Sequence, residues 1–342
     1  MFQIDYETAQ KRINALITTV LPDFYLDVII NPRMPYEKLV SEFDSVYKRG
    51  GGNLLGPKVQ FIPGGNGGNV AISFAGLGAK SFFLSKTSPL GKVLIDFYML
   101  PLGVNLITNQ TGEMASSVIF EIPTEGQKNN VMLSSAGSVA NFSSDVLTQD
   151  QWDTLTQSDV IVITNAQNLV LEDLAEGILN KIQGKGIISI DFSDLTPHKH
   201  RIDAFHNKIL SHPKRIPDFI MGNENEFLLL SRDSASSPSL ATKALSQDYP
   251  SIKFGLHQAK HAELWQNGEK LAYESCFEIQ VLFATGAGDS WHAGFLSAYK
   301  MGFNYSDAIK FANAVAGYKI STGKVATLRE LYSFVEYTKQ YQ

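Results

Sequence analysis

The chain of 342 residues contains a single cysteine, Cys276, which excludes an intrachain disulfide and a thiolate zinc cluster. No apolar run approaches the roughly 18 residues that cross a bilayer. The N-terminal stretch carries charges among its apolar positions, unlike a signal peptide. A net charge of -5 gives no general attraction to nucleic acid or to an acidic membrane surface. We therefore expect a cytoplasmic globular protein that binds neither nucleic acid nor membranes.

Apolar residues make up 44% of the chain and charged residues 18%, a balance typical of a folded domain with a sizeable core. Short apolar runs alternate with helical patterns. This alternation predicts an α/β fold with a mostly parallel sheet covered on both faces. The runs expected to form strands are 24–30, 81–85, 159–164, 186–192, 217–223 and 251–256.

Two segments interrupt the alternation. The stretches 116–123 and 129–135 read as a hairpin around TEGQK. The segment 31–62 contains a helical pattern, PYEKLVSEFDSVYKR, where a βα unit would be expected. We expect these pieces to form a small separate layer over one edge of the sheet.

Three polar turns follow predicted strands, where open α/β sheets bind ligands. The first is PGGNGGN at 63–69. Its glycines permit positive φ angles and a close approach of a ligand to the backbone. The amides of Asn66 and Asn69 can then hydrogen-bond hydroxyl groups. A flexible turn that leads into a helix explains the same residues.

The second turn runs from Asn223 to Glu226, just after a predicted strand. Acids in the first turn of a helix are favoured by the helix dipole, so capping is one explanation. The other places Glu226 near a hydrated Mg²⁺ ion, which keeps several waters and few carboxylate ligands.

The third turn lies in FATGAGDSWHAGF, residues 283–295. A helix that starts at 285–288 aims free N–H groups at one point and suits a phosphate. Asp289 would repel that phosphate. The conflict disappears if its carboxylate takes a proton from an attacking hydroxyl while the amides stabilise the transferring phosphoryl group. An ordinary N-terminal Asp of a helix remains the alternative.

These motifs, in this order and over roughly residues 20–330, resemble the ribokinase-like (PfkB) family of carbohydrate and nucleoside kinases. GGNGGNVA at 64–71 resembles the N-terminal signature, ATGAGD at 284–289 the C-terminal one, and FANAVAGYKIS at 311–321 the last helix. The resemblance implies a catalytic base, Asp289, and an anion hole at Gly286, Ala287 and Gly288. The other implied site residues are Asp27, Gly64, Gly65, Asn66 and Asn69 for the substrate, Asn223, Lys260, Gly286, Gly288 and Asn313 for the nucleotide, and Glu226 for the metal.

The resemblance also implies a single ribokinase-like domain over 1–342, with three α/β/α layers and a small β-rich lid from about 28–62 and 105–135. It implies ATP and Mg²⁺, a sugar or nucleoside substrate, and a homodimer formed through the lid, as is common among relatives. No arginine cluster lies near 23–27 or 64–69 to hold a second phosphate, which favours an unphosphorylated substrate.

Two positions depart from the family pattern. Phe283-Ala284 stand where relatives usually carry an Asp-Thr pair, which puts a monovalent-cation site in doubt. In LHQAKH at 256–261, Gln258 and His261 replace the glycines of the nucleotide-side turn. A kinase-fold binding protein that no longer transfers phosphate is therefore one alternative. A dinucleotide enzyme is another, although GGNGGN lacks the spacing of its fingerprint.

Overall fold

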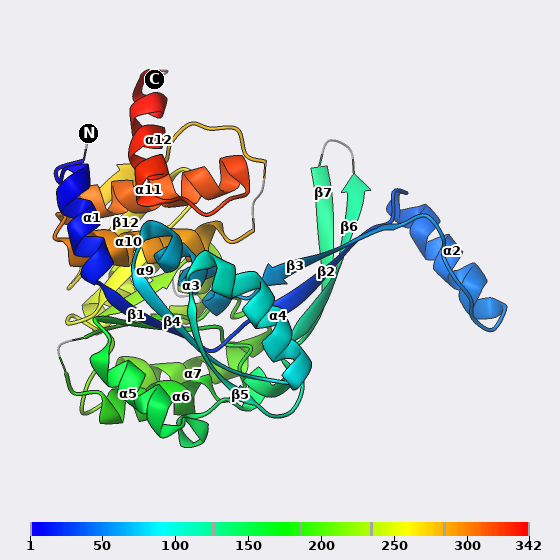
Figure 1. Cartoon of the computed structure of the whole chain (residues 1–342), viewed down its shortest axis with the longest axis horizontal. Helices are drawn as coiled ribbons and strands as arrows, with labels where there is room; N and C mark the ends of the chain where they lie inside the picture. The colour runs from blue at the N-terminus through cyan, green and yellow to red at the C-terminus, as the bar shows by residue number, and fades with distance from the viewer. Residues whose placement is uncertain (1, 125–126, 185, 233–234, 283–284, 341–342) are drawn as a thin grey trace.

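The computed structural model describes residues 2–124, 127–184, 186–232, 235–282 and 285–340. A large sheet lies between two layers of helices, and a smaller sheet extends from one side of this body (Figure 1). Within these residues the large sheet has nine strands in the order β13-β12-β11-β10-β9-β8-β1-β4-β5. Their bounds are β1 Ile17–Leu21, β4 Lys80–Thr87, β5 Asn105–Gln110, β8 Val160–Thr164, β9 Ile187–Asp191, β10 Phe219–Gly222, β11 Lys253–His257, β12 His261–Gln266 and β13 Glu269–Ser275.

The central strands are parallel and covered on both faces, as the sequence predicts. Every residue of β8 is buried. Val160 and Val162 pack into one hydrophobic core, whereas Ile161 and Ile163 pack into the other. Strands β12 and β13 add antiparallel pairs at one edge. The expected three-layer α/β/α architecture is therefore confirmed.

The described α-helices other than α2 divide between these two cores. One core draws on α1, α3, α4, α10, α11 and α12, and the other on α5 to α9. The bounds are α1 Tyr6–Ala15, α2 Tyr36–Lys48, α3 Asn66–Leu77, α4 Pro89–Met99, α5 Gln149–Gln157, α6 Leu171–Lys181, α7 Ile202–Phe205, α8 Glu224–Leu230, α9 Pro238–Asp248, α10 Ala287–Met301, α11 Tyr305–Thr322 and α12 Leu328–Gln340. None of the described helices is both long enough and apolar enough to cross a membrane.

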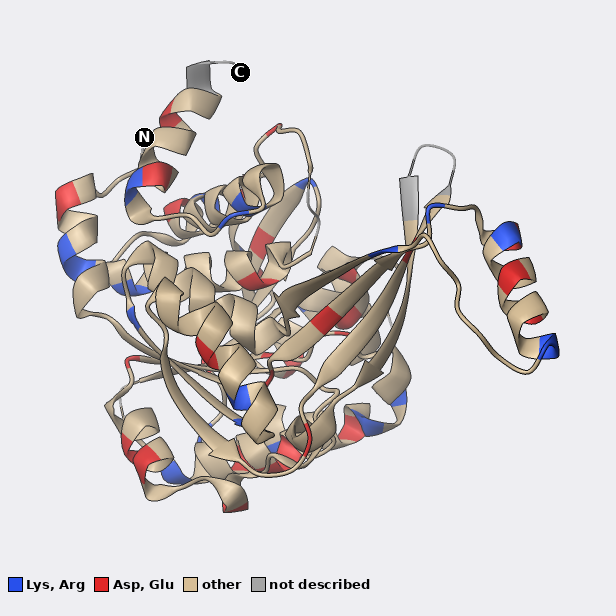
Figure 2. Cartoon of the chain, turned by 45° about the vertical axis from the view of Figure 1, so that its right-hand side comes forward, with Lys and Arg blue, Asp and Glu red and all other residues tan. Residues whose placement is uncertain are grey.

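The small sheet has the strand order β3-β2-β6-β7, with bounds β2 Tyr25–Asn31, β3 Lys58–Gly64, β6 Ser116–Thr124 and β7 Gln127–Ser135. The predicted hairpin is confirmed as β6 and β7. Helix α2, which bears charges of both signs, lies beyond the far end of this sheet (Figures 1 and 2). Of its 13 residues, all of them described, Leu39 alone is buried.

Two sequence predictions need correction. The first strand of the large sheet is β1, which precedes the apolar run that the sequence suggests, so the strand that carries Asp27 belongs to the small sheet. Residues 105–110 form β5 at the edge of the large sheet, paired with β4, and so lie outside the small sheet. The local sequence does not distinguish the two sheets, because strand pairing depends on partners that are distant in the chain.

Candidate active site

The turn before α3 is built around two close approaches. A Cβ atom at Gly64 would lie 2.1 Å from Oδ2 of Asp27, so only glycine leaves room for that carboxylate. Gly65 has a φ of 91°, in the left-handed region that favours glycine. The turn then starts α3 at Asn66, so the amides of Asn66 and Asn69 lie one helical turn apart on the same face.

These two asparagines meet Asp289 from the opposite helix. Asn66 Nδ2 donates to Oδ1 of Asp289 at 2.8 Å, and Asn69 Nδ2 donates to Oδ2 at 2.9 Å. The side chain of Asp289 is only 6% exposed. The structure thus brings together residues from the first and last sequence motifs, more than 200 positions apart in the chain.

Burial and like charges raise the pKa of Asp289 to about 8. Removal from water is the largest cause, and the Asp191 carboxylate comes next. The hydrogen bonds from Asn69 and Asn66 act in the opposite sense, because they stabilise the ionised form. A carboxyl group with a pKa near neutrality can both accept and release a proton under physiological conditions.

Helix α10 begins beside Asp289 with its first amides open. Gly286, in the left-handed conformation, is the N-cap, and no side chain among the described residues accepts from these amides. Ala287 and Gly288 line a cavity of about 860 Å³, together with the predicted nucleotide residues Asn223, Lys260 and Asn313. The N-terminus of α10 therefore separates this cavity from the Asp289 carboxylate.

Glu226 acts as a capping residue in the structure. Its Oε2 accepts from the backbone N–H of Asn223 at 2.8 Å, and Oε1 accepts from Asn223 Nδ2 at 2.8 Å. Burial, followed by repulsion from Asp191, raises the pKa of Glu226 well above its ordinary value. This geometry is compatible with both roles that the sequence suggests for Glu226, helix capping and magnesium binding. A carboxylate oxygen that caps a helix keeps a second lone pair.

The amide of Asn313 is fully engaged within the protein. Its Oδ1 accepts from Trp291 Nε1 at 2.8 Å, and its Nδ2 donates to the carbonyl of Ser275 at 3.1 Å. Asn313 therefore lines the cavity while both ends of its amide are bonded within the protein, and its oxygen holds the Trp291 indole in place. Lys260 lies exposed in the turn between β11 and β12.

Asp27 lies on β2 and points to the same turn. Burial raises its pKa to about 6, opposed by a hydrogen bond from Ser117. The charged group that shifts this pKa is another carboxylate, Asp23. The predicted substrate residues Asp27, Gly64, Gly65, Asn66 and Asn69 thus lie together around the turn before α3, next to Asp289; we call this group the substrate surface.

Comparison with known families identifies the fold. The profile of the pfkB family of carbohydrate kinases matches residues 34–330. The chain belongs to this family. As a PfkB-family kinase it is 25% identical to the ribokinase of Haemophilus influenzae over 302 residues, which cover 85% of this chain and 93% of the relative. It is 24% identical to the 5-dehydro-2-deoxygluconokinase of Lacticaseibacillus casei over 290 residues, 80% of this chain and 86% of that protein.

Solved structures agree with the fold. Arabidopsis thaliana ribokinase complexed with ribose and ATP superposes with a TM-score of 0.73 at 16% identity, covering 94% of this kinase and 99% of that chain. A putative ribokinase II from E. coli in complex with ATP and Mg²⁺ gives a TM-score of 0.70 at 16% identity, covering 94% and 99% of the two chains. The ribokinase-like fold class is therefore confirmed.

Sequence reasoning missed one polar group of this kinase, Asp191, and assigned no site role to another, His292. Asp191, at the end of β9, is buried and raises the pKa of both Asp289 and Glu226. His292 is fully buried, with Nε2 2.7 Å from Ser189 Oγ and Nδ1 3.7 Å from Asp191 Oδ2. Asp191 belongs to no recognisable motif, since a lone acid at the end of a strand carries no pattern of its own. His292 lies three residues after Asp289 in FATGAGDSWHAGF, and the structure packs its ring inside the protein.

His257 is a further group that the sequence did not single out. Its imidazole lies against Gly288, where an added Cβ would be 2.8 Å from Cε1. Burial lowers the pKa of His257 to about 4, so the ring is neutral at physiological pH. Glycine at 288 is therefore needed for this contact as well as for the open helix start.

Two other sequence predictions concern the monovalent-cation site and a dinucleotide-binding fingerprint. Phe283-Ala284, which bear on the monovalent-cation site, lie outside the described residues. GGNGGN begins at the last residue of β3, an antiparallel strand of the small sheet, and the family match excludes the dinucleotide enzyme.

Proposed function

We propose that this protein transfers the γ-phosphoryl group of ATP to a hydroxyl group of a neutral sugar or nucleoside, with Asp289 as general base. One observation carries the proposal. The Asp289 carboxylate, held by Asn66 and Asn69, lies beside the uncapped N-terminus of α10, which opens onto a cavity of about 860 Å³. A proton acceptor and a set of anion-binding amides are the two parts that this reaction needs at one point.

In this mechanism the nucleotide occupies the cavity with its terminal phosphate against Ala287 and Gly288. The substrate lies on the Asp27 side of the helix start, with its reacting hydroxyl at Asp289. Asp289 accepts the hydroxyl proton as the new O–P bond forms and the bond to the ADP oxygen breaks. The α10 amides stabilise the charge on the transferring group. The bound nucleotide is proposed by analogy with the ATP complexes of the Arabidopsis and E. coli neighbours.

The residues fit a magnesium ion that arrives with the nucleotide. Within the described part of the chain, no group of three or more His, Cys, Asp or Glu side chains is placed to hold a metal. The Glu226 carboxylate is hydrogen-bonded to Asn223, and Asn223 lines the cavity. Mg²⁺ is commonly held by one or two carboxylates together with phosphates and water. When bound, it would neutralise charge on the phosphate oxygens.

Charge at the substrate surface favours a neutral acceptor. The pKa of Asp27 is shifted by Asp23, a charge of the same sign, and the pKa of Asp23 itself is raised by burial. A phosphate or carboxylate on the substrate would add a further negative charge there. Carboxylates and amides instead suit the hydroxyl groups of a sugar or nucleoside.

We propose that the small sheet acts as the lid that excludes water during transfer. Asp27 and Ser117 lie on its inner face, at neighbouring register positions. The outer face is apolar. It carries the rows Phe61-Val28-Val118-Leu133 and Val59-Ile30-Phe120-Val131. An exposed apolar sheet face supports the expected homodimer through the lid.

A phosphorylation assay tests the function. The protein would be incubated with ATP, Mg²⁺ and a panel of ribose, other sugars, polyols, nucleosides and 5-dehydro-2-deoxygluconate, with ADP release and the phosphorylated product both measured. We expect turnover with a neutral acceptor and none for Asp289→Asn. Binding of these compounds without ADP release would instead support the alternative of a binding protein. Turnover of the sugar acid alone would refute the assignment of a neutral substrate.

A further inference from the structure

The site concentrates negative charge around one carboxylate. Asp191 and Asp23 both raise the pKa of Asp289, and Asp289 and Asp191 both raise the pKa of Glu226. The proposed reaction adds the phosphates of a nucleotide to this group. A fixed positive charge close to Asp289 would offset the repulsion and keep the base ionised.

Lys319, in the last turn of α11, is placed to supply that charge. Its side chain is partly buried, and no hydrogen bond or ion pair joins it to another described residue. Burial lowers the pKa of Lys319, and the Asp289 carboxylate opposes this effect. Lysine is rarely buried without a partner, because desolvating an ammonium group is costly.

Lys319 lines a second cavity, which has a volume of about 420 Å³. Its lining includes Asn69, Ser73, Ser290 and Lys319. Asn69 is the residue that donates to Oδ2 of Asp289 at 2.9 Å, and Ser290 is the next residue after Asp289. Ser73 Oγ and Ser290 Oγ, 3.1 Å apart, connect α3 to α10 at this point. Lys319 therefore lines a cavity together with Asn69, which holds the Asp289 carboxylate, and Ser290, which follows Asp289 in the chain.

We infer that Lys319 is a positioning residue whose ammonium group stabilises the ionised Asp289 carboxylate from the second cavity without touching the substrate. Its effect on turnover rests on the proposed function, whereas its effect on Asp289 does not. Among the described residues, the Asp191 and Asp23 carboxylates act on Asp289, and Asp289 in turn acts on Glu226 and on one cation, Lys319.

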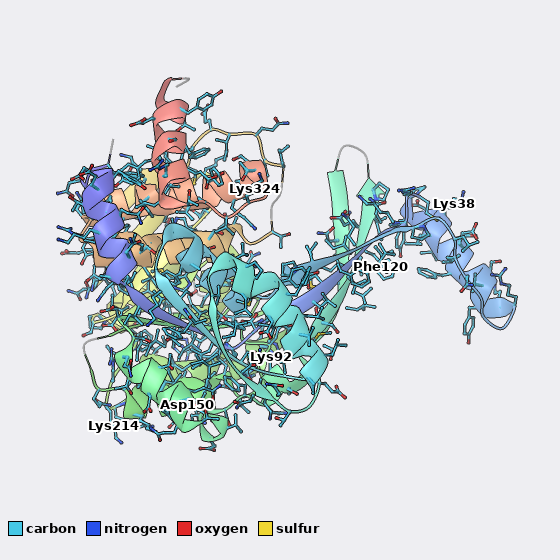
Figure 3. All side chains as sticks on the ribbon, in the orientation of Figure 1. Lys38, Lys92, Phe120, Asp150, Lys214 and Lys324 are labelled. Atoms are coloured by element: carbon cyan, nitrogen blue, oxygen red, sulfur yellow. The ribbon has the colours of Figure 1, made fainter. Side chains whose placement is uncertain are left out.

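Lys324 offers a matched control. It lines the same cavity from the loop after α11, but its side chain is exposed (Figure 3). Substituting either lysine by Met removes a charge and retains the length of the side chain. A difference between the two variants therefore reports the position of the charge and cannot come from a change in net charge.

The test titrates the Asp289 carboxyl group directly in the full chain. Carboxyl ¹³C signals would be followed against pH, and the Asp289 signal identified by its loss in Asp289→Asn. We expect Lys319→Met to raise the midpoint by about 0.5–1 pH unit, the effect of one nearby charge in a partly screened site. Lys324→Met and Lys319→Arg should leave it within about 0.2 pH unit, since an exposed charge is screened and Arg retains the charge.

Kinetics supply the second readout. In Lys319→Met the acid limb of kcat/KM should shift by the same amount, with kcat below the midpoint reduced about 3- to 10-fold, the loss of ionised base that such a shift produces, and substrate KM little changed. Ethylammonium, which the enlarged cavity can hold, should restore Lys319→Ala in a saturable way. Equal midpoints in wild type and Lys319→Met, or equal shifts in both Met variants, would overturn the inference. The carboxyl titration tests the effect of Lys319 on Asp289 even if no phosphorylated product is found. Failure of this inference can therefore be distinguished from failure of the proposed function.

Discussion

Replacing Asp289 by Asn isolates the role of one charge. The side chain keeps its shape, and its carbonyl oxygen still accepts from Asn66 or Asn69. The other asparagine then faces an NH₂ group and can rotate its own amide to present oxygen. If it does not rotate, an unpaired buried group costs about 1–3 kcal/mol. We therefore expect the variant to fold.

The rate should fall steeply. Loss of a positioned general base reduces turnover by about 10²–10⁴-fold. The reduction belongs in kcat, because Asn66, Asn69 and Asp27 remain available to bind the substrate. In the wild type, kcat/KM should rise with pH toward a midpoint near 8, the pKa of Asp289 in the free protein, and this limb should be absent in the variant.

The same substitution should change how stability depends on pH. The folded-state pKa of Asp289, about 8, lies above its ordinary value of 3.8, so between these values the folded protein holds a proton that the unfolded chain releases. The stabilising contribution is complete below about pH 4 and is lost as the pH rises to 8. The full difference corresponds to about 6 kcal/mol, at about 1.4 kcal/mol for each tenfold change in proton affinity.

Urea unfolding at several pH values between 5 and 9, alongside steady-state kinetics, measures both effects. The stability of Asp289→Asn relative to wild type should increase across this range. A variant with near-normal turnover would refute the catalytic role. Parallel stability curves would instead refute the raised pKa, because they would show that Asp289 titrates equally in the folded and unfolded chains.

Three further predictions separate the parts of the site. Gly64→Ala would place a Cβ 2.1 Å from Asp27 Oδ2 and should raise the substrate KM at least tenfold while leaving the ATP affinity measured by calorimetry unchanged. Gly288→Ala would place a Cβ 2.8 Å from His257 Cε1 and should weaken ATP binding at least tenfold, with substrate binding retained; the reverse pattern would contradict the assignment of the nucleotide and substrate sites. Sedimentation should give a dimer that Phe61→Lys with Leu133→Lys converts to a monomer, since these side chains are 59% and 64% exposed on the outer face of the small sheet; a wild-type monomer would rule out the homodimer.

The large parallel sheet could be predicted because its strands are nearly uniform apolar runs. The strand β1 could not, since ITTVL places two threonines at fully buried positions. Thr19 meets its hydrogen-bonding need through Ser158 Oγ at 2.6 Å, a partner 139 residues away that the local sequence does not reveal. The edge strand β5 was misplaced for a related reason, because its register with β4 is a long-range property.

Candidate site residues were predictable where they occur in a pattern. Asn66, Asn69 and Asp289 lie in glycine-rich motifs, and the structure joins them through hydrogen bonds. Asp191 and Lys319 act through charge across elements that are distant in sequence, and no spacing along the chain indicates such a relation. Of the two departures from the family pattern, Gln258 lies in the turn between β11 and β12 and lines the cavity, whereas His261 begins β12.

In the sequence, Asp289 lies where it would repel a phosphate bound at the N-terminus of its helix. A comparison of the N-termini of three helices resolves this conflict. At α3 the Asp23 carboxylate accepts from the amide of Gly67 at 3.0 Å, and at α8 Glu226 turns back to Asn223. In both cases an acid neutralises the positive end of a helix and closes it to other anions. Asp289 is also in the first turn of its helix, but its two oxygens are taken by asparagines of α3. The amides of α10 are therefore left for an external anion, and the same two hydrogen bonds that hold the carboxylate away from them hold it toward the substrate surface.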